Sequence, residues 1–235
     1  MANPSLIVEA FSETRNKTVI EPILLDFLNK MKRPASVLEL GCGNGIHALY
    51  YCSRYQENIG KWVMTDVPRA LPGVQRFMDA ANYEEMKVLT KSIFLPPLPL
   101  NFSDGEEKWR SVAEQGLTST TEAKVGTRGQ FDVVFTANTF HVASAAEIQT
   151  LFSRIPLVLC IGGVFLVYGP FNRGGKYTSP SNAQFDVHVK KVFGPLAAIQ
   201  HIEVLTKWAN ESGIELLAEH EVPENNFVLV FRRLK

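Results

Sequence analysis

A cluster of three glycines is the stretch of this chain best suited to hold a ligand. Gly41, Gly43 and Gly45 stand at alternate positions after a short apolar run, and Glu39 lies two positions before the first of them. Glycine tolerates positive φ angles and lets a ligand approach the backbone closely. A helix is expected at 46–55, and the N–H groups at its start would face the same ligand. The spacing predicts a strand, a tight turn and a helix around a cofactor site; a plain strand-to-helix turn with surface glycines is the alternative.

Asp66 ends the next expected strand, Lys61–Asp66. In a parallel sheet its carboxylate would lie beside the glycine turn, where it can accept hydrogen bonds from both hydroxyls of a ribose. Dinucleotide-binding proteins favour GxGxxG, whereas this chain has GxGxG followed by Ile46 and His47. Because the spacing departs from the dinucleotide motif, a nicotinamide-dependent dehydrogenase is a minor alternative.

An acid two positions before three alternating glycines resembles motif I of the Rossmann-like S-adenosylmethionine-dependent methyltransferases. The resemblance implies S-adenosyl-L-methionine as the cofactor. It assigns Glu39, Gly41, Gly43, Gly45 and Asp66 to cofactor binding. An antiparallel hairpin expected at the C-terminus adds to this resemblance.

Several further segments are similar to motifs of one branch of that superfamily. They are Thr14–Lys17 (TRNK), Glu21–Leu24 (EPIL), Asn138–Val142 (NTFHV), Val167–Phe171 (VYGPF), Ser181–Asp186 (SNAQFD) and Val222–Asn226 (VPENN). The branch is the small methyltransferase-like family that was long carried as a domain of unknown function and is similar to methyltransferase-like protein 26. The resemblance runs from about Arg15 to the C-terminus and leaves out residues 103–130.

The resemblance also assigns residues outside the glycine turn to the cofactor. Arg15 and Asn16 would form a lid over it, with the guanidinium suited to the cofactor carboxylate; a surface ion pair is the alternative. Asn138 would face the methyl group. Asn101 stands where the family has an aspartate, so it can hydrogen-bond an adenine or ribose edge but carries no charge.

His141 and Tyr168 are the candidate catalytic residues. Ligands of open α/β sheets lie beyond the carboxyl ends of the strands, and these residues follow or end the strands expected at 131–138 and 162–170. The unperturbed pKa of histidine is near neutrality, so His141 is the best candidate for a base, which is needed only when the acceptor must lose a proton. The alternatives are that His141 orients a loop or contacts substrate, and that Tyr168 lies at the edge of the core.

Six residues are assigned to the substrate. They are Phe140, Phe171, Asn182, Asp186, Asn225 and Asn226. The two phenylalanines follow strand ends and would line an apolar acceptor pocket. Asn182 and Asp186 lie four positions apart, on one helix face, and would bind a polar or amine-bearing group; helix capping by Ser181 or Asn182, with a solvated Asp186, is the alternative. Asn225 and Asn226 would otherwise be simple turn residues.

Strands alternate with helices along the chain, which is typical of βαβ units and a parallel sheet. The last two strands, expected at 214–222 and 226–233, have a short connector and must pair antiparallel. We therefore expect an α/β fold, a Rossmann-like doubly wound sheet of seven mostly parallel strands with a C-terminal antiparallel hairpin. Residues 1–235 would form a single methyltransferase-like domain, with the polar segment 103–130 as an insertion that carries one short helix.

The composition excludes several classes of protein. The chain has 24 Lys+Arg and 24 Asp+Glu and no net charge, which argues against a nucleic-acid partner and gives no reason to expect a membrane partner. Three scattered cysteines form neither a disulfide framework nor a zinc motif, so no metal is expected. No secretory signal or apolar span is visible. We expect a cytoplasmic protein with a small-molecule substrate.

The first functional hypothesis is a methyltransferase that moves the methyl group of S-adenosylmethionine to a small molecule by in-line displacement. The substrate half departs from the family: Lys191–Pro195 replaces an expected motif after SNAQFD. A second hypothesis is therefore an enzyme of the same fold that catalyses a cyclisation or rearrangement of a natural-product-like molecule. A third is a non-catalytic binding subunit.

Overall fold

The computed structural model describes the backbone of residues 4–80, 96–117 and 130–235. One seven-stranded sheet runs through it in the order β3-β2-β1-β4-β5-β7-β6. The strands are β1 (Ala35–Leu40), β2 (Ile59–Asp66), β3 (Leu98–Pro99), β4 (Phe131–Ala137), β5 (Leu159–Pro170), β6 (Ile214–Val222) and β7 (Asn226–Arg233). All pairs among β1 to β5 are parallel, whereas β7 pairs antiparallel with β5 and β6. The expected fold class is confirmed.

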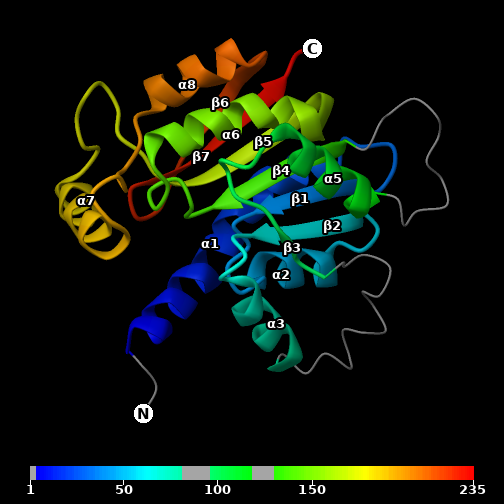
Figure 1. Ribbon diagram of the computed structural model, residues 1–235, viewed down its shortest axis with the longest axis horizontal. Helices are drawn as coiled ribbons and strands as arrows, with labels where there is room; N and C mark the ends of the chain where they lie inside the picture. Colours follow the sequence, from blue (N-terminus) through cyan, green and yellow to red (C-terminus); the bar gives the residue numbers. More distant parts are fainter. Residues whose placement is uncertain (1–3, 81–95, 118–129) are drawn as a thin grey trace.

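Helices cover both faces of the sheet (Figure 1). They are α1 (Pro4–Leu28), α2 (Ile46–Arg54), α3 (Leu71–Ala80), α5 (Glu106–Leu117), α6 (Ala145–Val158), α7 (Pro180–Phe193) and α8 (Ile202–Glu211). α1, α2 and α3 contribute to the core on one face, and α5, α6 and α8 contribute to the core on the other. α7 lies outside both layers, at one end of the molecule (Figure 1).

The carboxyl ends of the parallel strands meet at one edge of the sheet. Leu40 at the end of β1 pairs with Thr65 of β2 and Thr136 of β4, and Ala137 of β4 pairs with Tyr168 of β5. β1 is buried along its whole length, as expected for a central parallel strand covered on both faces. The residues that follow these strand ends are therefore brought together by the register of the sheet.

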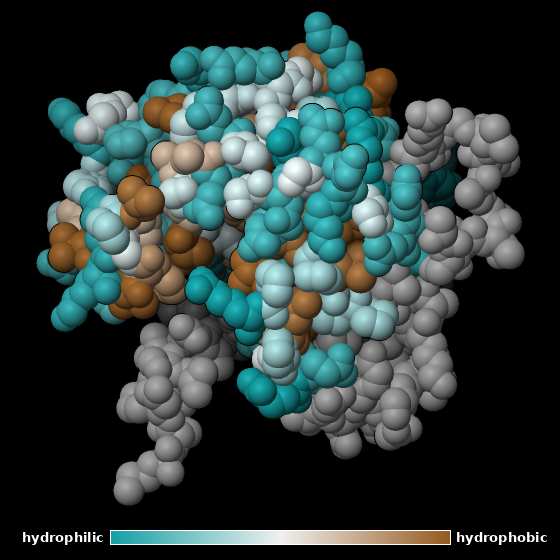
Figure 2. Space-filling view, in the orientation of Figure 1, coloured by the Kyte–Doolittle hydropathy of each residue, from teal (hydrophilic) through white to brown (hydrophobic). Residues whose placement is uncertain are grey.

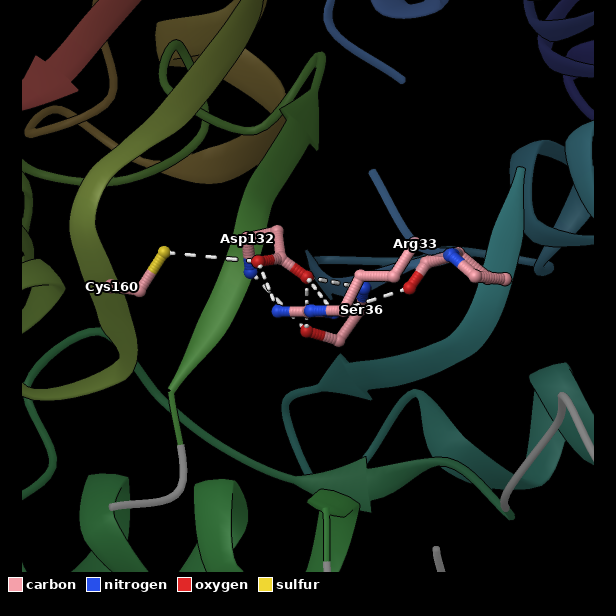
Figure 3. A network of polar contacts seen from close by, with 5 residues as sticks. Arg33, Ser36, Asp132 and Cys160 are labelled. Carbon is pink, nitrogen blue, oxygen red and sulfur yellow. Dashed lines mark hydrogen bonds and ion pairs between the residues drawn. The ribbon is translucent and has the colours of Figure 1, made fainter. Parts of the chain in front are cut away.

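A polar network links three strands at the opposite end of the sheet (Figure 3). Asp132, near the start of β4, accepts hydrogen bonds from the Arg33 guanidinium at 2.8 and 2.9 Å. It also accepts from the backbone N–H and the hydroxyl of Ser36 at 2.8 and 2.9 Å. The thiol of Cys160, on β5, lies 3.9 Å from the same carboxylate. The network ties β1, β4 and β5 together at the end remote from the glycine turn.

The segment predicted to be an insertion contains part of the core. α5 occupies Glu106–Leu117 within it, and the Trp109 side chain is fully buried. A Cβ at Gly116 would lie 2.9 Å from a methyl group of Val63, so α5 packs closely on β2. The segment carries a helix, as expected, and the apolar side chains of this helix cover the sheet; that the segment is an insertion stays a prediction. Residues 118–129 lie outside the described part of the chain.

Candidate active site

The glycine turn joins β1 to α2 through a left-handed backbone. Gly41, Gly43 and Gly45 have φ angles of 65°, 58° and 80°, a region that other residues enter only with strain. A Cβ at Gly41 would lie 2.3 Å from the γ-methyl of Thr139, which belongs to the loop after β4. The backbone N–H of Cys42 donates to the Thr65 carbonyl at 3.0 Å. The turn is thus locked between the ends of β2 and β4.

Asp66 closes this turn from the adjacent strand end. One carboxylate oxygen accepts the Gly43 N–H at 2.8 Å and the other accepts the Val67 N–H at 2.7 Å. Burial raises the pKa of this half-buried carboxyl, although the two N–H donors and Arg69 oppose the shift. Each carboxylate oxygen can accept more than one hydrogen bond. Asp66 therefore has acceptor capacity left for ligand hydroxyls beside the turn.

The start of α2 opens toward the same place. Gly45 at the N-cap has no side chain to cap the helix, and the side chain of Asn44 accepts the Ile46 N–H at 3.1 Å. Unpaired N–H groups in the first turn of a helix favour negatively charged or oxygen-rich groups. The turn, α2 and Asp66 together offer donors on one side and a carboxylate acceptor on the other.

Glu39 lies beneath the turn and not on its surface. Its side chain is buried, accepts the indole N–H of Trp62 at 2.8 Å and lies 3.4 Å from Nδ1 of His47. The alternation of β1 turns residue 39 toward the face that α2 covers. Glu39 thus links β2 and α2 under the glycines, and its assignment to cofactor binding stays a prediction.

Asn16 and Tyr168, which are both assigned to the predicted site, lie in contact. The Tyr168 hydroxyl donates to Oδ1 of Asn16 at 2.8 Å, and both side chains are buried. α1 therefore reaches across the end of β5. The side chain of Arg15 lies outside the described residues. Asn101 binds Asp104 through its backbone N–H at 2.9 Å and its amide at 3.3 Å, so part of its hydrogen-bonding capacity holds its own loop.

Asn138 adopts a strained conformation where β4 ends. Its φ angle is 57°, and its N–H donates to the Tyr168 carbonyl at 2.9 Å. Asparagine tolerates the left-handed region better than most residues, and such outliers cluster at functional sites. The half-buried side chain has no hydrogen bond to any residue that the structure describes. Asn138 is therefore oriented by its backbone and keeps its amide available.

His141 is buried against α7. Its side chain is 7% exposed, and the edge of its ring meets the ring of Phe185, with 5.0 Å between the centroids. Burial lowers the pKa of His141 to about 4, because the desolvated site disfavours the imidazolium. The pKa of His141 therefore lies below the near-neutral unperturbed pKa of histidine. The imidazole is neutral at physiological pH and can accept a proton, although it is a weaker base than a solvated histidine.

Phe140 and Phe171 are placed in the core. They are 3% and 1% exposed, and their ring centroids are 6.3 Å apart. Phe140 also contacts Phe152 and Phe165, on the face that α6 covers. The packing of aromatic side chains turns both rings inward, and their contact with an acceptor stays a prediction.

Asn182 and Asp186 anchor α7. The Asn182 amide donates to the Thr178 hydroxyl at 2.9 Å and to the Asn225 carbonyl at 3.3 Å. Asp186 accepts from the Ile199 N–H, the Tyr177 hydroxyl and Lys190. The helix N-cap is Ser179 and not Ser181 or Asn182, and Asp186 is buried and not solvated. Both side chains are buried and hold α7 in place, and their contact with substrate stays a prediction.

The burial of Asp186 alone would raise its pKa. The hydrogen bonds from Lys190, the Ile199 N–H and Tyr177 outweigh this effect and hold the pKa of Asp186 below its usual value. Three apolar side chains of α7 are nevertheless exposed: Val187, Val192 and Phe193 are 53–69% exposed. Figure 2 shows apolar side chains gathered at this end of the molecule. α7 thus buries its polar anchors Asn182 and Asp186 while part of its apolar surface faces outward.

Asn225 and Asn226 lie at the tip of the β6–β7 hairpin. Asn225 has a φ angle of 56° and donates to the Ser181 hydroxyl at 3.3 Å; Asn226 donates to the Pro223 carbonyl at 3.4 Å. Both also line a cavity of about 430 Å³ beside the hairpin. Asn225 is a turn residue, whereas Asn226 begins β7, and both face the cavity.

Three residues of this region were not selected from the sequence. Phe185 covers His141, Thr139 packs on Gly41, and His47 contacts Glu39. Phe185 lies inside the SNAQFD segment and His47 directly follows the glycine turn, so position in a motif could have pointed to both. Thr139 carries no such signal, because only the close approach of two loops shows its importance.

Two general features frame the site. Within the described ranges, no group of three His, Cys, Asp or Glu side chains is arranged to hold a metal ion. No described helix combines the length and the apolar character needed to span a membrane.

A family model described as "Protein of unknown function (DUF938)" matches residues 9–233. The chain belongs to the DUF938 family. Among solved structures, this DUF938 protein is similar to an O-methyltransferase family protein from Burkholderia thailandensis, with a TM-score of 0.66 and 15% identity over 97% of this chain and 59% of that one. It is also similar to the S-adenosylmethionine-dependent methyltransferase SibL, with a TM-score of 0.62 and 19% identity over 97% and 57% of the two chains.

A third similar structure is described as a pericyclic reaction enzyme. Its TM-score is 0.59, with 13% identity over 86% of this chain and 44% of that one. The DUF938 chain therefore spans about half the length of the structures it matches. At identities this low, the structural similarity shows a shared fold alone. This fold is the class I methyltransferase fold, which agrees with the observed sheet.

Proposed function

We propose that this DUF938 protein is an S-adenosylmethionine-dependent methyltransferase that acts on a small molecule. The observation that carries the proposal is the left-handed glycine turn at Gly41–Gly45 with the Asp66 carboxylate on its Gly43 N–H. Methyltransferases among the solved structures share the fold. S-adenosyl-L-methionine, when bound, would supply an electrophilic methyl group.

The donor set fits an adenosyl sulfonium. Asp66 has acceptor capacity for ribose hydroxyls, and the uncapped start of α2 has donors for polar oxygen atoms. Asn101 would contact the adenine or ribose edge. Asn16, which lies on α1 and is held by Tyr168, would lie against the cofactor. Arg15 is assigned to the cofactor carboxylate by its neighbouring position in the sequence. Glu39 would act through the turn that it braces.

The remaining residues would position the acceptor. Methyl transfer from a sulfonium is an in-line displacement, and alignment of the two reactants can supply roughly 7–11 kcal/mol of the barrier. The side-chain amide of Asn138 lies at the end of β4 with no hydrogen bond to any described residue, and the Tyr168 hydroxyl links the neighbouring strand end to Asn16. His141 would accept the proton of a hydroxyl or amine acceptor, since its neutral form predominates.

Calorimetry with S-adenosylmethionine and with S-adenosylhomocysteine tests the cofactor assignment. We expect both to bind the wild-type protein and to bind Asp66→Asn more weakly. Absence of binding by the wild type would overturn the proposal and favour a non-catalytic subunit. Binding of a nicotinamide cofactor in place of both would favour a dehydrogenase.

A second candidate is a rearrangement or cyclisation that keeps the cofactor but transfers no methyl group. The solved pericyclic reaction enzyme of the same fold favours it, and so does the low basicity of buried His141. Transfer of a labelled methyl group into candidate acceptors separates the two functions. Conversion of an acceptor with no label in the product would select the second candidate.

A further inference from the structure

The cavity beside the β6–β7 hairpin has no role in the steps above. It lies between the hairpin tip and the loop that follows β5, with Arg173 and Thr178 on the loop side and Glu221, Asn225, Asn226 and Phe227 on the hairpin side. Its volume of about 430 Å³ falls within the range of small-molecule sites. α7 braces both walls, since Asn182 donates to Thr178 and to the Asn225 carbonyl.

The charges around this cavity are unequal. Arg173 forms an ion pair with Glu219 and lies 5.9 Å from the centroid of the Phe227 ring, so its charge is already balanced. Glu221 and Glu224 also line the cavity. Glu221 is exposed and has no ion pair or hydrogen bond with any side chain in the described ranges. The cavity is therefore electronegative and attracts cations.

The cavity lies within reach of the proposed methyl-transfer position. Asn226 pairs with Pro170 at the end of β5, and β5 is the neighbour of β4, whose end carries Asn138. Neighbouring strands are about 4.8 Å apart, so the hairpin tip lies on the order of 10 Å from the end of β4. A small molecule of that length would extend from one place to the other.

Resting on the proposed function, we propose that this cavity binds the distal end of the acceptor and selects molecules that carry an ammonium group there. Glu221 would pair with the ammonium, and the amides of Asn225 and Asn226 would accept its remaining hydrogen bonds. The apolar side chains of Val222 and Phe227 would contact the adjoining carbon atoms. Glu221 is thus a specificity-determining residue of the acceptor and takes no part in proton transfer.

Titration of the ¹⁵N-labelled protein with 2-phenylethylammonium tests this proposal, with 2-phenylethanol and 3-phenylpropionate as neutral and anionic analogues. We expect the ammonium to shift the amide signals of residues 221–227 and to bind more tightly than either analogue. Glu221→Gln should weaken its binding by about fivefold, the scale of a partly exposed ion pair. Glu107→Gln, at an exposed position on α5, is the matched control and should change nothing.

Equal binding of the alcohol, preferred binding of the carboxylate, or unchanged binding by Glu221→Gln would each overturn the proposal. The titration needs no cofactor, so its result does not depend on that of the calorimetry. Glu221→Gln should also bind S-adenosylmethionine as the wild type does. A wild type that binds the ammonium but not S-adenosylmethionine would overturn the proposed function and leave the cavity assignment in place.

Discussion

The two halves of the proposed site are held by different forces. On the cofactor side, backbone geometry and close packing position the groups. Three glycines have left-handed φ angles, a Cβ at Gly41 would lie 2.3 Å from Thr139, and the Asp66 carboxylate accepts the Gly43 N–H. On the acceptor side, α7 is held by the hydrogen bond that the Asn182 amide donates to Thr178 and by the one that Asp186 accepts from the Ile199 N–H. The first arrangement leaves no room for a Cβ at Gly41, whereas the second can be weakened one hydrogen bond at a time. We infer that acceptor choice can change while cofactor binding is kept.

Replacement of His141 should produce the largest effect on activity, and this effect should be confined to the turnover rate. If His141 accepts the acceptor's proton, His141→Ala should lower kcat by about 100- to 10,000-fold and leave S-adenosylmethionine affinity unchanged. The wild-type rate should also fall as the pH approaches about 4, because the imidazole then becomes protonated. Labelled methyl transfer measures both effects.

His188→Ala is the matched control, because His188 is exposed and stacks on Phe185, which His141 also contacts. Near-normal turnover by His141→Ala would remove the assignment of a base.

Gly41→Ala tests the rigidity of the cofactor side. The added methyl group meets Thr139 and the φ angle is positive, so overpacking and backbone strain together should lower the free energy of unfolding by about 3 kcal/mol. Gly162→Ala has a φ angle of 78° but nothing within 4 Å, so it should cost only about 1 kcal/mol. Denaturant unfolding measures the difference, and equal losses would contradict the steric argument.

Asp66→Asn should weaken cofactor binding more than it weakens the fold. Hydrogen bonds to a charged group contribute roughly 1.5–3 kcal/mol, so the affinity for S-adenosylmethionine should fall by about 10- to 100-fold. Calorimetry measures the affinity. Asp26 lies on α1 and forms an exposed ion pair with Lys30, so the control Asp26→Asn should bind the cofactor normally. An unchanged affinity in Asp66→Asn would show that the ribose lies elsewhere.

Asp186→Asn should affect stability and the acceptor side while sparing the cofactor. Loss of a buried, charge-assisted anchor costs about 1–3 kcal/mol. Because the folded pKa of Asp186 is depressed, the anchor stabilises the wild type above the unfolded pKa, near 3.8, and is lost as the pH falls through the lower folded value. The stability gap between wild type and variant should therefore narrow in acid. A gap that widens there would reverse the assigned sign.

The order of elements and the glycine turn could be predicted because they depend on local pattern. Apolar runs that enter Gly41 and end at Asp66 are typical of parallel strands, and the connector between β6 and β7 is too short for anything but a hairpin. These signals need only neighbours in the sequence. The resulting sheet brought Gly43 and Asp66 within 2.8 Å, as expected.

The sequence by itself thus determined the α/β fold class and the C-terminal antiparallel hairpin, and it predicted where a cofactor would lie. Only the tertiary structure decided which way the side chains point: Glu39, Phe140 and Phe171 turn inward, and Asp186 holds α7. The physical reason is that the apolar pattern of a strand depends on consecutive residues, whereas the partner of a buried polar or aromatic side chain comes from a distant segment. Residue type shows that such a group needs a partner, and packing alone selects it.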